Sequence, residues 1–480
     1  MKVIFLVDDF LIEPLGIGYL SSVLKNAGHA VDLVKTFGKI DIPEELRHLR
    51  YEKVVFAYSV TTGTQQYYIK LNNLIKTYFT ESVSVFGGPH PTYFPEILTE
   101  ENVDFIIRGE GEVSFLELLD NDITISKKSD SQKGISNLVE DLDLIPFPDR
   151  DLMYKYEKNR NNPIKSVMTM RGCPFSCTYC YNVLYKKLYL EHGQKLVRFR
   201  GARNIIDECK ELKRYPLEMI YFQDDEFTSN PSFKELMLLY KEEVKVPFHA
   251  QLRIDRITEE KIILLKEAGC IGVTFAIESG SENIRKTLLN RHMTNEKVLD
   301  GVKLLKKHKM KFRTENMIGI PTETKKDILD TIKLNIECKP DVAWASIFQP
   351  YPNLELGKKC EELGLWKSDV DSFSPNFFDE TELKFPREHA RFVNNMQKFF
   401  DVSCRHGWFL PLAQVLCFLP ENKYFKSFYS WYKQKGYDKL YKIEIKEERC
   451  RKRKNHKSRV GLPLRELVTK VLVPRFSQKN

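Results

Sequence analysis

The chain has 480 residues, of which 42% are hydrophobic and 29% charged, with a formal net charge of +9. A chain of this length exceeds one ordinary hydrophobic core, so we expect two or three domains. The sequence has no uninterrupted apolar run of about 18 residues or more, which excludes an ordinary transmembrane segment. The start, MKVIFLVDDF, has an Asp pair after a short apolar run, which favours a first strand over a signal peptide and predicts a cytoplasmic protein.

Residues 1–125 alternate between short apolar runs and segments of helical period. The apolar runs are VIFLV, AVDLV, KVVFAYS, VSVFGG and VDFIIRG. Strands that alternate with helices predict an α/β domain with a doubly wound parallel sheet, Rossmann or flavodoxin-like, of about five strands. Ligands of such sheets bind beyond the carboxyl ends of the strands, where this sequence places DDFLIEP, SVTTGT, GGPHPT and GEGE.

Three further regions follow. Residues 126–163 are polar and turn-rich, and the prolines of LIPFPDRDL interrupt any helix, so we expect a linker. Residues 164–375 hold six strand candidates separated by helical segments, which predicts a partial or full βα barrel with its active site at the C-terminal ends of the strands. Residues 376–480 predict a helical C-terminal region whose basic tail, CRKRKNHKSR, is interpreted as solvated rather than as a site for nucleic acid or an anionic surface.

Three cysteines, Cys173, Cys177 and Cys180, follow the first barrel strand, whereas the other seven cysteines occur singly. Bunched thiols in a reducing compartment predict a metal site rather than disulfides. Closely spaced thiolates can each ligate one iron of an iron–sulfur cube, and three ligands leave a fourth iron open. Zinc is the alternative, but a structural zinc site takes four ligands, and His192 and Cys209 do not form a second pair.

The Cys-x3-Cys-x2-Cys spacing, with Tyr179 directly before the last cysteine, resembles the signature of the radical S-adenosylmethionine (SAM) superfamily. The resemblance implies a 4Fe-4S cluster on the three cysteines, SAM on the open iron, and reductive cleavage to a 5′-deoxyadenosyl radical. It also implies contacts with SAM from later strand ends: Asp224 and Asp225 in FQDDEFT (amino group), Arg253 in AQLR, Glu278 and Ser279 in AIESGS (ribose), and Ile318 in NMIGIPTET (adenine). Taken singly, the Asp pair and ESGS could instead be helix caps.

The N-terminal region resembles the cobalamin-binding domain that precedes many radical SAM domains, and the two resemblances cover about residues 1–375. The implied cobalamin-binding residues lie in the strand-end segments: Ser59, Thr61, Thr62, Gly87, Gly88, His90, Gly109, Glu110 and Gly111. The glycines would let backbone approach a flat macrocycle, and the hydroxyls could bond its amides or nucleotide tail.

One feature of many cobalamin enzymes is missing, because the sequence has no Asp-x-His-x-x-Gly motif to supply a cobalt ligand. His90 and His29 are the histidine candidates; His90 could equally be a plain loop residue, whereas His29 is interpreted as a residue of a helix-to-strand turn. A weakly ligated lower face of cobalamin would favour methyl transfer from cobalt to a carbon radical.

The resemblances imply a cobalamin-dependent radical SAM enzyme, in the first place a methyltransferase acting on an unactivated carbon or on phosphorus of a small-molecule or lipid substrate. Cyclisation or rearrangement without methyl transfer is the alternative. A tRNA methylthiotransferase is disfavoured because no cysteine precedes Cys173, and a non-catalytic cobalamin or iron–sulfur sensor ranks last. The implied partner is a one-electron donor such as flavodoxin or ferredoxin, and nucleic acid is not expected. The C-terminal aromatics, Trp408, Phe425, Tyr429 and Trp431, could line a lipid or aromatic pocket or form a helix core.

Overall fold

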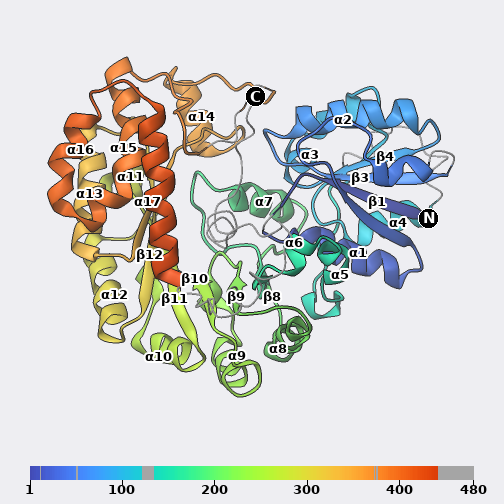
Figure 1. Ribbon diagram of the computed structural model, residues 1–480, viewed down its shortest axis with the longest axis horizontal. Helices are drawn as coiled ribbons and strands as arrows, with labels where there is room; N and C mark the ends of the chain where they lie inside the picture. The colour runs from blue at the N-terminus through green and yellow to red at the C-terminus, as the bar shows by residue number, and fades with distance from the viewer. Residues whose placement is uncertain (11, 50–51, 122–133, 372, 374–376, 442–480) are drawn as a thin grey trace, which may run out of the picture.

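The computed structural model describes residues 1–441 apart from 11, 50–51, 122–133, 372 and 374–376. The basic tail and the first part of the predicted linker therefore lie outside the described residues. The predicted α/β architecture is confirmed: Figure 1 shows an N-terminal sheet, a second larger sheet, and a group of C-terminal helices at the opposite end of the molecule from the N-terminal sheet.

The N-terminal unit is a five-stranded parallel sheet in the order β2-β1-β3-β4-β5. Its strands are β1 (Lys2–Val7), β2 (Ala30–Lys35), β3 (Val54–Ser59), β4 (Val83–Gly87) and β5 (Phe105–Ile106). Its helices are α1 (Leu15–Asn26), α2 (Gln65–Tyr78), α3 (Pro89–Tyr93) and α4 (Glu112–Asp120). Successive β1 residues alternate between two buried layers, with Val3 in one and Ile4 in the other, as a sheet covered on both faces requires. The strand order reverses beside β1, so the crevice for a ligand opens there.

The second unit is a six-stranded parallel sheet in the order β13-β12-β11-β10-β9-β6. Its strands are β6 (Ile164–Val167), β9 (Met219–Phe222), β10 (Phe248–Gln251), β11 (Cys270–Glu278), β12 (Lys311–Ile318) and β13 (Val342–Ile347). Its helices are α8 (Ala202–Glu211), α9 (Phe233–Leu239), α10 (Glu259–Glu267), α11 (Glu282–Thr287), α12 (Asn295–Lys307), α13 (Lys325–Cys338) and α14 (Glu355–Glu362). Because β6 and β13 form two edges, the barrel is partial, one of the two predicted forms.

Two small elements frame the cysteines. The predicted strand SVMTM divides into β6 and β7 (Met170–Arg171), and β7 pairs antiparallel with β8 (Arg198–Phe199). Helix α7 (Tyr181–Leu190) begins directly after Cys180. The cysteine loop is therefore fixed by a two-stranded antiparallel sheet at one end and by a helix at the other.

The linker and the C-terminal region are helical. Two short helices, α5 (Arg150–Tyr154) and α6 (Glu157–Arg160), precede β6. The C-terminal helices are α15 (Arg387–Arg405), α16 (Leu410–Leu416) and α17 (Lys423–Tyr441). Helix α15 buries Val393, Met396 and Phe400 in a core shared with β12 and β13, so this region covers the β13 side of the barrel. No helix in the part of the chain that the structure describes is long and apolar enough to cross a bilayer.

Candidate functional site

A cavity of about 500 Å³ lies where the strand ends of the two units meet. Of the residues that the sequence singled out, seven line it: Ser59, Gly87, Gly88, Gly109, Glu110, Gly111 and Asp225. The barrel contributes Gly172, which precedes Cys173, and Asn182, which follows Cys180 by two residues. Much of the remaining lining is apolar, with Leu20, Ile107 and Phe115 among it. The cavity thus has a glycine-rich wall on one side and the cysteine loop on the other.

Three of the predicted cobalamin-binding residues do not belong to this lining. The His90 ring is buried, stacks on Phe94 at 5.1 Å between ring centres, and has Nδ1 3.3 Å from the Thr62 hydroxyl. Burial lowers the pKa of His90 to about 4, so the imidazole is neutral at pH 7. The Thr61 hydroxyl lies 3.2 Å from that of Thr64 within the same turn. The side chains of these residues contact their own and neighbouring loops, and their cofactor roles stay predictions.

Gly109 packs against Tyr189 of helix α7, which follows the cysteine loop. Its φ of +88° lies in the left-handed region, and a Cβ on this residue would lie 2.0 Å from the Tyr189 hydroxyl. The same hydroxyl accepts a hydrogen bond from the backbone N–H of Glu110 at 3.0 Å. Helix α7, which follows the cysteines, therefore packs directly on the GEGE loop of the N-terminal sheet.

We expect Gly109→Ala to lower the free energy of unfolding by about 2 to 4 kcal/mol, because left-handed backbone and an overpacked methyl group both oppose it. Gly193 is the matched control, since it has a φ of +72° but no atom within 4 Å of its Cβ position. Gly193→Ala should cost only the backbone part, about 1 to 2 kcal/mol. Equal losses in urea unfolding of the two variants would contradict the close packing of Tyr189.

The Glu110 carboxylate forms ion pairs with two arginines of the two-stranded β7–β8 sheet. It is 3.1 Å from Arg171 Nη1, accepts from Arg198 through both of its oxygens, and also accepts from the backbone N–H of Val139 at 3.2 Å. Burial alone would raise its pKa, but Arg198 and Arg171 outweigh burial and lower it. Arg171 also pairs with Glu112 at 2.5 Å. These ion pairs join the GEGE loop to the start of the cysteine loop.

The three cysteines lie on one loop at the C-terminal ends of β6 and β7. Cys177 is buried, whereas Cys173 and Cys180 are half-buried. Burial raises the pKa of the Cys173 thiol to about 12 and that of Cys180 to about 11. The free thiols are therefore protonated at neutral pH, and binding iron must displace these protons. Asn290 braces the loop by donating to the Ser176 carbonyl at 2.8 Å.

Asp224 fixes the entrance to this loop. Its Oδ1 accepts hydrogen bonds from the backbone N–H groups of Thr169 and Met170, at 2.7 and 2.9 Å. Its Oδ2 is buried without a hydrogen-bond partner among the described residues. A carboxylate oxygen left free in this way suits a cationic ligand group, as the amino group of SAM is. Asp225 instead accepts from Asn182 at 2.7 Å and faces the cavity.

Burial raises the pKa of Asp224 from 3.8 to about 7, so the folded protein holds this proton more tightly than the unfolded chain. The resulting stabilisation is complete below pH 3.8 and is lost as the pH rises through about 7. Asp224→Asn removes the titration. We expect the stability of the unsubstituted protein relative to this variant to fall by up to about 4 kcal/mol between about pH 4 and about pH 8. Urea unfolding without SAM measures the difference, and a pH-independent difference would contradict the assignment.

Further predicted residues gather around the cysteine loop. The Tyr179 hydroxyl donates to Glu278 Oε1 at 2.8 Å, and Glu278 has a φ of +67°, a strained position for a residue with a side chain. The Arg253 guanidinium pairs with Asp255 at 2.9 Å and lies 4.0 Å from the centre of the Phe175 ring, inside the loop. The Glu278 carboxylate and the Arg253 guanidinium therefore both contact side chains of the cysteine loop.

Ser279 and Ile318 lie away from this cluster of side chains. The Ser279 hydroxyl accepts from the backbone N–H of Ser281 at 3.2 Å, in a turn before α11, and Ser281, the N-cap of this helix, makes no side-chain cap hydrogen bond. The Ile318 side chain is buried in the core against α15, and its carbonyl accepts from the backbone N–H of Phe348 at 2.8 Å. Their contacts with SAM stay predictions.

Sequence reasoning missed Arg291 and a row of tyrosines. Arg291 is buried, donates to the Ala276 carbonyl at 2.5 Å, and lies 3.4 Å from the Tyr179 hydroxyl. Tyr181, which follows Cys180, stacks on Tyr93 of the N-terminal unit at 4.9 Å between ring centres. It also meets Tyr351 at 4.9 Å. The sequence TYCYN, which has a tyrosine on each side of Cys180, could have predicted aromatic contacts at this loop. Nothing in the sequence pointed to a role for Arg291.

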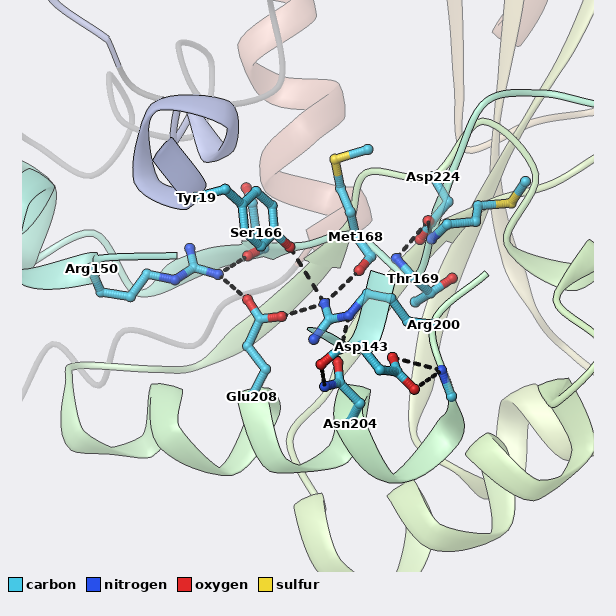
Figure 2. Close-up of polar contacts among 12 residues, drawn as sticks. Tyr19, Asp143, Arg150, Ser166, Met168, Thr169, Arg200, Asn204, Glu208 and Asp224 are labelled. Atoms are coloured by element: carbon cyan, nitrogen blue, oxygen red, sulfur yellow. Dashed lines mark hydrogen bonds and ion pairs between the residues drawn. The ribbon is translucent and has the colours of Figure 1, made fainter. Parts of the chain in front are cut away.

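A buried ion network fixes the two units around the cavity (Figure 2). Arg150 of the linker donates to Glu208 at 2.6 Å and to the Ser166 carbonyl at 2.7 Å, and pairs with Glu13 of the N-terminal unit at 2.8 Å. Glu208 also accepts from Arg200 at 2.5 Å.

Arg200 connects this network with two residues of the cavity wall. It donates to the Met168 carbonyl at 2.8 Å and lies 3.5 Å from the Tyr19 hydroxyl, and both Met168 and Tyr19 line the cavity. The position of one unit against the other is thus set by fully buried charges.

The residues present fit the predicted cofactors. Three thiols on one loop are the ligand type of an iron–sulfur cluster, although the described residues contain no three metal-ligating side chains already gathered as a site, and the free oxygen of Asp224 suits an ammonium group. At Gly87 an added Cβ would have no atom nearer than 3.9 Å, so the wall leaves space beside this glycine where a flat macrocycle could approach, whereas the Cβ positions of Gly88, Gly109 and Gly111 are occupied by the protein's own atoms.

The sequence matches two family descriptions, the radical SAM superfamily over residues 167–334 and the B12 binding domain over residues 1–119. It is 30% identical over 372 residues to the uncharacterized methyltransferase PH0819 of Pyrococcus horikoshii, covering 72% of this chain and 77% of that protein. It is 25% identical over 383 residues to cytidylyl-2-hydroxyethylphosphonate methyltransferase of Streptomyces wedmorensis, covering 64% and 69%. It is also 25% identical over 425 residues to the anaerobic magnesium-protoporphyrin IX monomethyl ester cyclase of Rubrivivax gelatinosus, covering 81% and 73%.

Two solved structures share the fold. The radical SAM methyltransferase TsrM of Kitasatospora setae has a TM-score of 0.61 at 15% identity, covering 76% of this chain and 79% of that one. The cobalamin-dependent SAM radical enzyme OxsB has a TM-score of 0.66 at 16% identity, covering 91% and 71%. Both family matches confirm the resemblances, and with them the predicted cluster, SAM and cobalamin. The chain therefore belongs to the radical SAM superfamily and carries an N-terminal B12 binding domain.

Proposed function

We propose that this protein is a methyltransferase that delivers a methyl group to an unactivated carbon, or to phosphorus, of a small-molecule or lipid substrate. One observation carries the proposal: a single cavity is lined both by the glycine strand ends of the B12 binding domain and by residues beside the cysteines. When bound, the cluster and SAM supply hydrogen-atom abstraction, and cobalamin carries the methyl group. The substrate atom has to meet both, so a shared cavity is what methylation requires.

The chain's own residues have three tasks in this function. Asp224 Oδ2 offers an acceptor for the amino group of SAM, and Arg253 holds Phe175 of the loop in place. The apolar wall that includes Leu20, Ile107 and Phe115 keeps water from a reactive radical. Similarity to two named methyltransferases supports the outcome.

We further propose that the protein works in the cytoplasm and receives single electrons from a flavodoxin or ferredoxin. The cysteines that the structure describes are all free thiols, as a reducing compartment maintains them. SAM cleavage needs an electron from outside the chain, which such a carrier provides.

The test begins with anaerobic purification and reconstitution with iron, sulfide and cobalamin. We expect a cluster absorption band, a cobalamin spectrum that stays with the protein through gel filtration, and iron near four atoms per chain, as one cluster requires. Comparison of metabolites from cells with and without the protein should then reveal a product heavier by one methylene. A chain that retains no cobalamin would overturn the proposal.

Cyclisation or rearrangement is the second candidate, because the similarity to the Rubrivivax cyclase extends over 81% of this chain. The same metabolite comparison separates the two, since neither a cyclisation nor a rearrangement adds a methylene to the substrate. A methylthiotransferase function would need a second cluster. Iron near eight atoms per chain would support this second cluster and with it a methylthiotransferase. The sequence argues against it, because residues 1–172 contain no cysteine that could ligate a second cluster.

A further inference from the structure

Helix α16 and its flanks have two apolar faces, which is unusual for a helix at the surface. The inner face, Leu410, Ala413 and Cys417, is buried against α15 and its neighbours. The outer face repeats at helical spacing and is exposed to 77%, 49%, 63% and 48%, in the order Trp408, Leu412, Val415 and Leu419. Within the described residues nothing covers this outer row.

The outer row belongs to a larger apolar surface. Of the sixteen exposed large hydrophobic residues described in the chain, seven lie between residues 408 and 431. We call these seven the apolar face: Trp408, Leu412, Val415, Phe418, Leu419, Tyr424 and Trp431. His406 joins its α16 and α17 parts, because its ring lies 6.3 Å from those of both Trp408 and Tyr432, the neighbour of Trp431. Contiguous exposed apolar patches of this kind often mark sites where a protein binds another protein, a ligand or a membrane.

Cations border the apolar face on several sides. Lys325 lies 5.3 Å from the centre of the Phe418 ring, Lys423 5.5 Å from that of Tyr424, and Lys435 4.0 Å from that of Trp431. The sequence that follows α17, residues 442–480, holds thirteen Lys and Arg against four Glu, which equals the whole net charge of the chain. Positive charge is therefore concentrated at the C-terminal region, while residues 1–441 are neutral overall.

We propose that the apolar face binds the surface of a membrane that contains anionic lipids. Leu412, Val415 and the two tryptophans would enter the boundary between head groups and acyl chains, while the bordering lysines contact lipid phosphates. The aromatic residues of the face could stack on bases, but the exposed Leu412, Val415 and Leu419 between them offer no stacking platform, whereas an acyl-chain boundary accepts both kinds of side chain, so a nucleic acid fits this surface less well. Helix α16, which carries much of the face, lies at the end of the molecule away from the N-terminal sheet, so this sheet would stay in water (Figure 1). The inference does not rest on the proposed methyl transfer.

Vesicle sedimentation of the full chain tests the inference. We expect binding to vesicles of equimolar phosphatidylcholine and phosphatidylglycerol, little binding to pure phosphatidylcholine, and weaker binding at high salt. Leu412→Asp with Val415→Asp should weaken binding to the anionic vesicles at least about tenfold. The matched control is Leu238→Asp with Ile263→Asp, on α9 and α10, at residues that are 48% and 39% exposed. This control should bind as the unsubstituted protein does.

A second measurement needs no variant that could misfold. Phosphatidylglycerol brominated in its acyl chains should quench the tryptophan fluorescence of the unsubstituted protein, and Trp408→Phe should lose part of that quenching. Absence of sedimentation and quenching, or equal binding by the two double variants, would overturn the inference. Tight binding to polyuridylate without binding to vesicles would also overturn it and assign the surface to nucleic acid.

Discussion

Replacing Cys177 with alanine is expected to remove the cluster and to lower SAM cleavage at least about 100-fold. Loss of a residue that only supports a metal ligand already costs about 10- to 100-fold, so loss of a ligand itself exceeds that. Cys177 is one of three thiols on the loop, and the cysteines elsewhere in the barrel, such as Cys209 and Cys360, are fully buried and cannot replace it. Iron content and 5′-deoxyadenosine formation after reconstitution measure the effect.

The same loop predicts how iron loading depends on pH. Because burial raises the pKa of Cys173 to about 12 and that of Cys180 to about 11, each thiol must release a proton when it binds iron. Iron uptake should therefore become more favourable as the pH rises toward these values. Loading that is independent of pH would show that the thiols are already ionised in the free protein.

Cys209→Ala is the control, since this thiol is buried in the barrel core and distant from the loop in sequence. It should keep its iron and its SAM cleavage and lose only packing, about 1 to 2 kcal/mol of stability. If Cys177→Ala kept its full iron content, or Cys209→Ala lost it, the assignment of the cluster to this loop would be wrong.

Local patterns were enough to predict the parts of the fold that bring these cysteines into place. Runs such as VIFLV and MIYFQ are short, apolar and bounded by turn residues, and each of them became a buried parallel strand. The carboxyl ends of such strands share one edge of a sheet. The predicted glycines Gly87 and Gly109 therefore lie at one cavity although 22 positions separate them in the chain.

Contacts between units could not be predicted in this way. Glu208 follows an ordinary amphipathic pattern in α8, and only the docked linker makes it a partner of Arg150. The packing of Tyr189 on Gly109 and that of Tyr181 on Tyr93 likewise need the two units to be in place. From a single sequence, the burial of a residue can be predicted much better than the element against which it packs.

Glu208→Gln is expected to lower the free energy of unfolding by about 3 to 5 kcal/mol, because it leaves two buried arginines with one remaining carboxylate. Arg150 keeps Glu13, but Arg200 has no other carboxylate among its described contacts. Since Arg200 also holds Met168 and Tyr19 of the cavity wall, the variant should bind cobalamin more weakly as well. Urea unfolding and cobalamin retention measure the two effects.

The same helix offers a matched control for this charge effect. Arg203 and Lys210 of α8 pair with Glu243, at 2.6 and 3.0 Å, in an arrangement like that of Arg150, Arg200 and Glu208 but open to solvent. Glu243→Gln should change stability little, because water screens the exposed pairs and solvates the arginine and the lysine that are left. If both substitutions cost the same, the buried network would be no more than a set of ordinary ion pairs. If only Glu208→Gln also loses cobalamin, the network is what keeps the two halves of the cavity together.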